Sequence, residues 1–144
     1  MTVTAKRLKF EVTVSRSAAL EADGARLELA TGWTAEHLLM AALVRCSITS
    51  LRYHARRAGI AAEAGGSARG LVTKRHDDGR YAFVEAEISL DVELDPEPDA
   101  TETAALLAKA ERDCFISASL RIAPTYRWRV NGRDAEPAAL TSSA

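Results

Sequence analysis

The feature that most constrains this chain is a long helical segment that is apolar on nearly every side. Residues 35–59 read AEHLLMAALVRCSITSLRYHARRAG, and apolar side chains fill most positions between Leu38 and Leu51. Thr34 can cap the start of this helix, and Gly59 can end it. A helix without a continuous polar face does not lie on a protein surface. Other parts of the structure must therefore wrap around it.

Alternating segments on both sides of this helix predict the strands that cover it. Residues 8–14 alternate apolar and polar side chains, which indicates a half-buried strand. An Asp-Gly turn then precedes a shorter partner strand through Leu27 and Leu29. Residues 81–94 alternate over a longer run after a second Asp-Gly turn, with one apolar and one charged face.

The second half of the chain predicts a shorter helix and a last strand. The sequence DPEPDA breaks the chain, and an amphipathic helix follows over residues 101–114. Residues 115–124 could hold another short helix, and residues 126–130 alternate as a strand. The small, polar tail from about residue 133 is expected to be frayed. The length of residues 1–144 is that of a single domain.

Composition and charge exclude two classes of partner. The formal net charge is −1, with 19 basic and 20 acidic residues mixed along the chain, so no broad basic face invites nucleic acid. The N-terminus has no apolar run of the signal-peptide kind, and Arg45 and Arg52 interrupt the best candidate for a membrane span. We therefore expect a soluble, cytoplasmic protein that binds neither nucleic acid nor membrane.

The chain has two cysteines, Cys46 and Cys114, which form neither a disulfide framework nor a zinc motif. Such a pair is most simply interpreted as inert core thiols. Each cysteine nevertheless belongs to a distinctive block. The first is WTAEHLLMAALVRC, residues 33–46, and the second is CFIS, residues 114–117.

These two blocks resemble the paired cysteine motifs of the OsmC/Ohr family of thiol-dependent peroxidases. The first is similar to the family's N-P-E-x-L-x-x-A-x-x-x-C block, and the second to its C-P-x-S block, although Phe115 replaces the proline. The resemblance covers roughly residues 6–130. It implies an OsmC-like α+β fold, with antiparallel sheets wrapped around long central helices in an intertwined homodimer.

The resemblance also implies roles for individual residues. Cys46 corresponds to the peroxidatic cysteine, Cys114 to the resolving cysteine, and Glu36 to a carboxylate that pairs with an arginine. Arg16, after the first strand, is the nearest match to that arginine, and Arg26 is the alternative. The family implies an organic hydroperoxide as substrate, an external dithiol of the lipoyl type as reductant, and no cofactor.

The chemistry of peroxide reduction requires these residue types independently of the family. A thiolate must attack the O–O bond, yet a free cysteine is mostly protonated near neutral pH. A guanidinium beside the sulfur favours the thiolate, and a carboxylate can hold that guanidinium in place. A second thiol then captures the sulfenic acid as a disulfide and protects it from further oxidation.

The spacing of Glu36 and Cys46 restricts how they could share one arginine. Ten residues of straight helix separate them by ~15 Å, too far for both to contact the same guanidinium. Either the helix breaks between them or Glu36 serves the cysteine of another subunit, which the resemblance favours. Arg45 is expected to point away from Cys46, because adjacent helical side chains diverge by ~100°.

An alternative function stays open at this point. The chain could be a non-catalytic OsmC-like protein that binds a small molecule or a partner and has little peroxidase turnover. A cysteine hydrolase is less favoured, because His37, His54 and His76 have no spacing that places one beside a cysteine. These histidines are expected on the surface.

Overall fold

The computed structural model describes residues 4–139, which divide into two compact units at the boundary between Thr34 and Ala35. The first unit contains three short strands. The second contains three helices and a four-stranded sheet. Among the described residues, no helix is long and apolar enough to cross a membrane.

The first unit is a small antiparallel sheet of β1 (Thr13–Val14), β2 (Leu20–Ala22) and β3 (Ala25–Leu27). The predicted Asp-Gly turn joins β2 to β3, and both of its residues have positive φ, as tight hairpin turns require. The predicted strand over residues 8–14 is wrong for residues 8–12. Only its last two residues have a partner strand within the described chain, and an extended segment without hydrogen-bonding partners is not a strand.

The second unit is built on a sheet of β4 (Ala61–Lys74), β5 (Tyr81–Asp95), β6 (Thr125–Val130) and β7 (Arg133–Ala135), in that order. The predicted turn joins β4 to β5 as an antiparallel hairpin. The expectation of purely antiparallel sheets is wrong at β5 and β6, which pair in parallel. A parallel pair needs a long crossover connection, and the helical segment between these two strands provides it.

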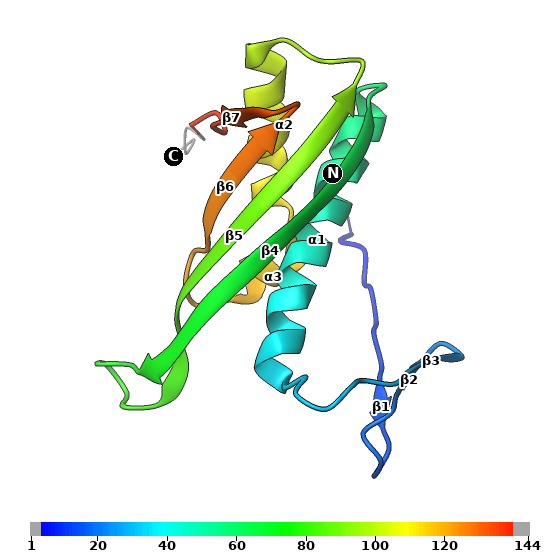
Figure 1. Cartoon of the computed structure of the whole chain (residues 1–144), viewed down its shortest axis with the longest axis vertical. Coiled ribbons are helices and arrows are strands. Elements are labelled where there is room, and N and C mark those ends of the chain that lie inside the picture. Colours follow the sequence, from blue (N-terminus) through cyan, green and yellow to red (C-terminus); the bar gives the residue numbers. More distant parts are fainter. Residues whose placement is uncertain (1–3, 140–144) are drawn as a thin grey trace. The chain divides into compact units, whose positions relative to one another are not determined.

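Two helices cover one face of this sheet (Figure 1). They are α1 (Ala35–Arg57) and α2 (Ala100–Arg112), and the short α3 (Phe115–Ser119) follows directly. Asp99 caps α2 by accepting a hydrogen bond of 2.8 Å from the main-chain nitrogen of Glu102. The long helix, the second helix and the short third helix all agree with the sequence prediction.

The core lies between the two helices and the sheet. As predicted, alternate residues of β5 point inward, while the intervening residues of its central part are largely exposed. The core side chains are Leu43 and Leu51 of α1, Ile88, Leu90 and Val92 of β5, Leu106, Leu107 and Ala110 of α2, and Trp128 and Val130 of β6.

One stripe of α1 stays exposed, which differs from the expectation that every side of this helix is covered. Ala41, Arg45 and Thr49 recur at a spacing of four residues and face solvent. The sheet and α2 pack on the opposite side, where Leu43, Leu51 and other residues are buried. A single copy of this unit therefore wraps only part of the helix.

The segment after β6 is ordered where a frayed tail was expected, and that prediction is wrong for residues 133–135. Asn131 turns the chain with a positive φ, and its side-chain oxygen and nitrogen bind the main-chain N–H and C=O of Leu94 at 2.8 and 3.2 Å. These bonds fix the turn so that β7 can pair with β6. Residues 140–144 of the predicted tail lie outside the described residues.

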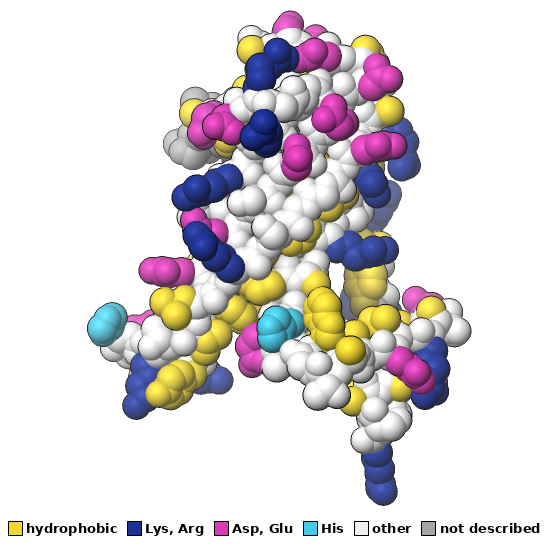
Figure 2. All heavy atoms as spheres, in the orientation of Figure 1, with side chains coloured by type: hydrophobic (Ala, Val, Ile, Leu, Met, Phe, Trp, Pro, Cys, Tyr) yellow, Lys and Arg dark blue, Asp and Glu magenta, His cyan; other side chains and the backbone are white. Residues whose placement is uncertain are grey.

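The outer face of the sheet carries mixed charge. Figure 2 shows acidic and basic side chains interspersed over the upper part of this view. On β5, the Glu87 carboxylate lies 2.6 Å from Arg69 of β4 and 3.3 Å from Arg127 of β6. These contacts are exposed, so their contribution to stability is small. The alternation of sign leaves no broad basic patch on the face shown.

Candidate active site

A polar face on α1 attaches this helix to the segment that carries Cys114. The face consists of Ser47, Ser50 and His54, which lie one above another on the helix at intervals of three and four residues. Ser50 Oγ donates a 2.8 Å hydrogen bond to a main-chain oxygen of α2. His54 Nε2 lies 2.8 Å from a carboxylate oxygen of Asp113. The expectation of a surface position is wrong for His54, whose side chain is only 12% exposed.

Cys114 stands between α2 and α3 and has no exposed surface. It occupies the N-cap position of α3, where its Sγ accepts a hydrogen bond of 3.4 Å from the main-chain nitrogen of Ser117. Ser47 Oγ donates a second hydrogen bond of 3.5 Å to the same sulfur. The sulfur is therefore held from two directions, by its own short helix and by α1.

Asp113, which precedes Cys114, is fixed by two neighbours. The Arg112 guanidinium binds its carboxylate at 2.9 and 3.0 Å and lowers its pKa, and the hydrogen bond from His54 lowers the pKa further. The carboxylate is therefore ionised at neutral pH and remains an acceptor for both partners. These contacts fix the end of α2 from which the chain enters Cys114.

Cys46 lies half-buried on α1, and both cysteines are free thiols. Burial raises the pKa of the Cys46 thiol, and the neighbouring Cys114 thiol, which is within hydrogen-bonding reach, raises it further. The main-chain N–H groups of Ile116 and Phe115 act in the opposite direction. The net effect of this environment favours the neutral thiol, so a reactive Cys46 requires an additional positive charge.

Ser47 and Tyr126 are among the residues of this site that were not predicted from the sequence. Tyr126, on β6, places its hydroxyl 2.9 Å from Ser47 Oγ, and its ring stacks on Trp128 with 5.7 Å between centroids. Burial raises the pKa of the Tyr126 phenol to about 12. The sequence did contain a signal for both residues. Ser47 lies among the apolar residues of the long helix and Tyr126 on the apolar side of the last strand, and a polar group that is buried at such a position needs a hydrogen-bonding partner.

Glu36 lies ten residues from Cys46 along α1, and the candidate arginines belong to the other unit of the chain. Glu36 is in the first turn of α1, and α1 continues without interruption through Cys46, so the explanation by a broken helix is wrong. Arg16 lies in the turn after β1 and is exposed. Arg26, on β3, forms ion pairs of 3.1 Å with Glu21 and with a second glutamate of its own hairpin.

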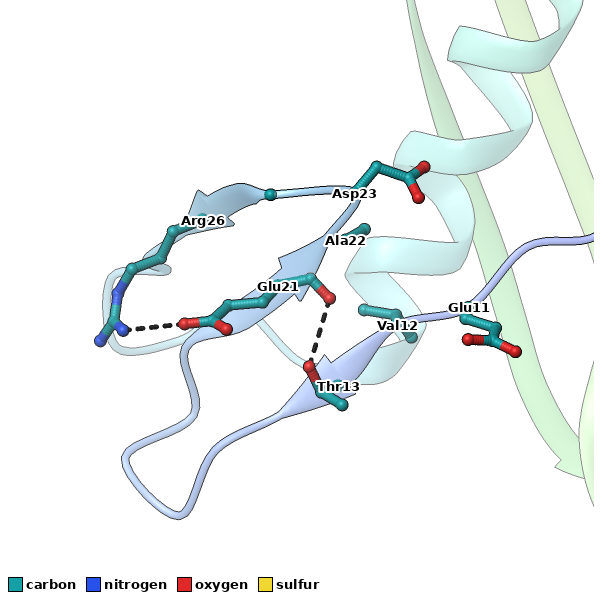
Figure 3. A pocket seen from close by; sticks show the side chains of 8 residues that line it. Glu11, Val12, Thr13, Glu21, Ala22, Asp23 and Arg26 are labelled. Atoms are coloured by element: carbon teal, nitrogen blue, oxygen red, sulfur yellow. Dashed lines mark hydrogen bonds and ion pairs between the residues drawn. The ribbon is translucent and has the colours of Figure 1, made fainter.

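Figure 3 shows Arg26 and the neighbouring side chains of the small sheet formed by β1, β2 and β3. The Arg26 side chain extends along β2 to the Glu21 carboxylate, while the main-chain oxygen of Glu21 accepts a 3.4 Å hydrogen bond from Thr13. These side chains border a shallow hollow together with Glu11, Val12 and Asp23. The acidic partners already neutralise Arg26 locally, so it is the less suitable cation of the two.

The remaining charged candidates are exposed. Arg45 is exposed and therefore points away from Cys46, as expected. His37 and His76 are exposed, as expected. Across residues 4–139, no group of three or more His, Cys, Asp or Glu side chains could hold a metal ion.

The fold and the thiol pair define a class of protein in which a long helix presents one cysteine to a second, buried cysteine at the start of a short helix. The chain belongs to the OsmC-like protein family, whose model matches residues 23–129. None of the curated proteins compared with this chain matches it.

Solved structures share this fold at low sequence identity. An OsmC-like protein of unknown function from Vibrio cholerae has a TM-score of 0.72 at 14% identity, over 85% of this chain and 100% of that one. The organic hydroperoxide resistance protein OhrB of Bacillus subtilis has a TM-score of 0.54 at 18% identity, over 85% and 96%. An organic hydroperoxide resistance protein from Elizabethkingia anophelis has a TM-score of 0.58 at 19% identity, over 90% and 98%.

The meeting of the two thiols predicts that they can form an intrachain disulfide without unfolding. A disulfide needs Cα atoms within about 7 Å and Cβ atoms that face each other. We expect one equivalent of an organic hydroperoxide to link Cys46 to Cys114, detected by mass spectrometry of disulfide-linked peptides. Circular dichroism should show an unchanged helix content. Oxidised Cys46 that is never joined to Cys114 would contradict the prediction.

Proposed function

We propose that this chain is a thiol-dependent peroxidase that reduces organic hydroperoxides through Cys46, with Cys114 as the resolving cysteine. The observation that carries the proposal is the approach of the two thiols where α1 meets α3. Fold similarity to organic hydroperoxide resistance proteins supports the substrate class. The exposed Phe115, next to Cys114, offers an apolar surface for the organic part of such a substrate.

The proposed reaction uses two thiols and no cofactor. The Cys46 thiolate attacks one peroxide oxygen, the O–O bond breaks, and the alkoxide leaves and takes up a proton as an alcohol. Cys46 is then a sulfenic acid, which Cys114 attacks to form a disulfide and release water. An external dithiol, for which the family suggests a lipoyl group, reduces the disulfide by thiol–disulfide exchange.

Single-turnover measurements on cysteine variants test this proposal. Cys46→Ser is expected to abolish hydroperoxide consumption, because the attacking sulfur is lost. Cys114→Ser should still consume about one equivalent and leave Cys46 as a sulfenic or over-oxidised acid, identified by mass spectrometry. If Cys46→Ser consumes hydroperoxide as wild type does, Cys46 is not the nucleophile, and a binding role for this fold replaces the proposal.

Arg16 is proposed as the cation that favours the Cys46 thiolate, with Glu36 as the carboxylate that holds it. Within residues 4–139, Arg16 forms no ion pair, whereas Arg26 is engaged by glutamates of its own hairpin. The pKa of Cys46 is raised by burial, so the proposed chemistry needs an opposing positive charge. Because an intact α1 separates Glu36 from Cys46, Glu36 is proposed to serve the other subunit.

Matched arginine variants separate the two candidates. Arg16→Met is expected to raise the pKa of Cys46 further and to slow its oxidation at pH 7 by roughly ten- to a hundredfold. The rate should recover as the pH is raised, because the thiolate then forms without the cation. Arg26→Met should stay within about twofold of wild type. Stopped-flow measurement of hydroperoxide consumption from pH 6 to pH 10 provides the test, and the reverse ranking would assign the role to Arg26.

The exposed apolar side chains of the first unit support a homodimer. Leu8, Phe10, Val12 and Val14 alternate along the N-terminal segment, and each is more than half exposed, Phe10 by 82%. This pattern is that of a strand whose pairing partner and apolar cover come from elsewhere. A second copy of the chain is the proposed partner, and the exposed stripe of α1 is a separate surface proposed to contact it.

Sedimentation equilibrium tests the proposed dimer. Wild type is expected to be dimeric at micromolar concentration. Phe10→Glu should weaken the dimer by at least tenfold, because it places a charge in the apolar contact. Lys9→Glu alters the charge at the adjacent position, on the polar side of the alternation, and should leave the dimer intact. A monomeric wild type would exclude a site shared between subunits.

A further inference from the structure

Cys114 contacts a chain of hydroxyl groups that the reaction proposed above does not use. Ser47 Oγ donates to Cys114 Sγ at 3.5 Å, and the Tyr126 hydroxyl lies 2.9 Å from Ser47 Oγ. Ser47 and Cys114 have no exposed surface. Buried polar groups are retained in a fold when they are hydrogen-bonded, so this arrangement fixes the positions of both hydroxyls. We call Ser47 and Tyr126 the hydroxyl chain.

The direction of the hydroxyl chain follows from its bond to sulfur. Ser47 Oγ donates its single proton to Cys114 Sγ, so it accepts from the Tyr126 hydroxyl, whose pKa burial raises to about 12. Ser47 can then accept from Tyr126 while it donates its own proton to the sulfur. Stacking against Trp128 holds the tyrosine ring, and the Trp128 indole is itself fixed by a 2.8 Å hydrogen bond to Glu111.

We propose that the hydroxyl chain stabilises the thiolate of Cys114 and thereby accelerates its attack on the sulfur of Cys46. Ser47 donates to the reacting sulfur and acts on it directly, and Tyr126 holds Ser47 Oγ and also lies close enough to this sulfur to interact with it. The proposal deepens the peroxidase function, and its biological use rests on that function. The contacts that carry it are present in the reduced protein, whatever oxidant reacts with Cys46.

The hydroxyl chain acts on the step in which Cys114 attacks the sulfenic acid of Cys46. The Cys114 thiol gives up its proton to the hydroxide that leaves, and its sulfur lone pair forms the S–S bond as the S–O bond of the Cys46 sulfenic acid breaks. The hydroxide that leaves takes up a proton and becomes water. A donor to the sulfur increases the thiolate fraction. A stabilised thiolate is also a weaker nucleophile, but on a logarithmic scale this loss is only about half as large as the gain in thiolate fraction. The rate at which Cys114 attacks Cys46 therefore rises.

A disulfide reagent isolates this step without peroxide. Dithiodipyridine converts Cys46 to a mixed disulfide with release of one thiopyridone, and Cys114 then attacks Cys46 and releases a second. We expect Ser47→Ala and Tyr126→Phe to slow the second release about three- to tenfold near neutral pH. The first release, which depends on Cys46, should stay within about twofold of wild type.

Ser50→Ala is the matched control. It removes another buried hydroxyl of α1, one that donates to a main-chain oxygen of α2 and not to a sulfur. It should leave the ratio of the two release rates unchanged. A general loosening of the contact between α1 and α2 would instead alter that ratio in all three variants, and such a result would overturn the proposal.

The pH profile of the second release separates thiolate stabilisation from simple displacement of Cys114. The ionisable groups around this thiol are Cys46 of α1 and Tyr126 of β6, with Asp113 and its partner His54 next along the chain. If the hydroxyl chain favours the thiolate, the profiles of Ser47→Ala and Tyr126→Phe shift to higher pH and reach or exceed the wild-type rate at high pH, where thiolate formation no longer limits the step.

A second release that is slow at every pH, or one that matches wild type in both variants, would overturn the proposal. Failure of the peroxidase function gives a different result. In that case hydroperoxide is not consumed, whereas both releases with dithiodipyridine and their dependence on Ser47 persist.

Discussion

The site depends on the contact between the polar face of α1 and the segment that joins α2 to α3. Ser47, Ser50 and His54 each form one hydrogen bond across it, to a sulfur, a main-chain oxygen and a carboxylate. These groups are wholly or mostly buried, so loss of a partner would leave a polar atom of Ser50 or His54 unsatisfied, whereas Ser47 would keep its bond to Tyr126. The contact fixes the rotation of α1 about its axis, and this rotation directs Cys46 toward Cys114.

The same burial that brings the thiols together opposes the chemistry proposed for them. Removal from water raises the pKa of Cys46, and the nearby thiol of Cys114 adds to that effect. Main-chain N–H groups at the start of α3 offset it only in part. A site of this kind is organised for exchange between two sulfurs, and the proposed reaction with peroxide would need a cation from outside this cluster.

The two units of the described chain hold different parts of the proposed site. The second unit holds both cysteines and most of the apolar core, whereas the first holds Arg16 and Arg26 and exposes its apolar side chains. A row of exposed apolar side chains such as this one is typical of a surface that contacts another chain. The proposed dimer would cover it, and it would complete the site with the same contact.

The sequence by itself determined the elements with strong local signals: the long helix, the β4–β5 hairpin with its inward-facing alternation, and the two cysteine blocks. It also determined the family. Tertiary structure decided what depends on partners distant in the chain. Residues 8–12 have strand periodicity but no partner, β6 pairs in parallel because the helices reverse the chain direction, and Asn131 orders a segment whose composition suggests fraying. The roles of Ser47, His54 and Tyr126 were likewise undetermined, because a polar residue acquires its function from the group that packing places within about 3 Å of it.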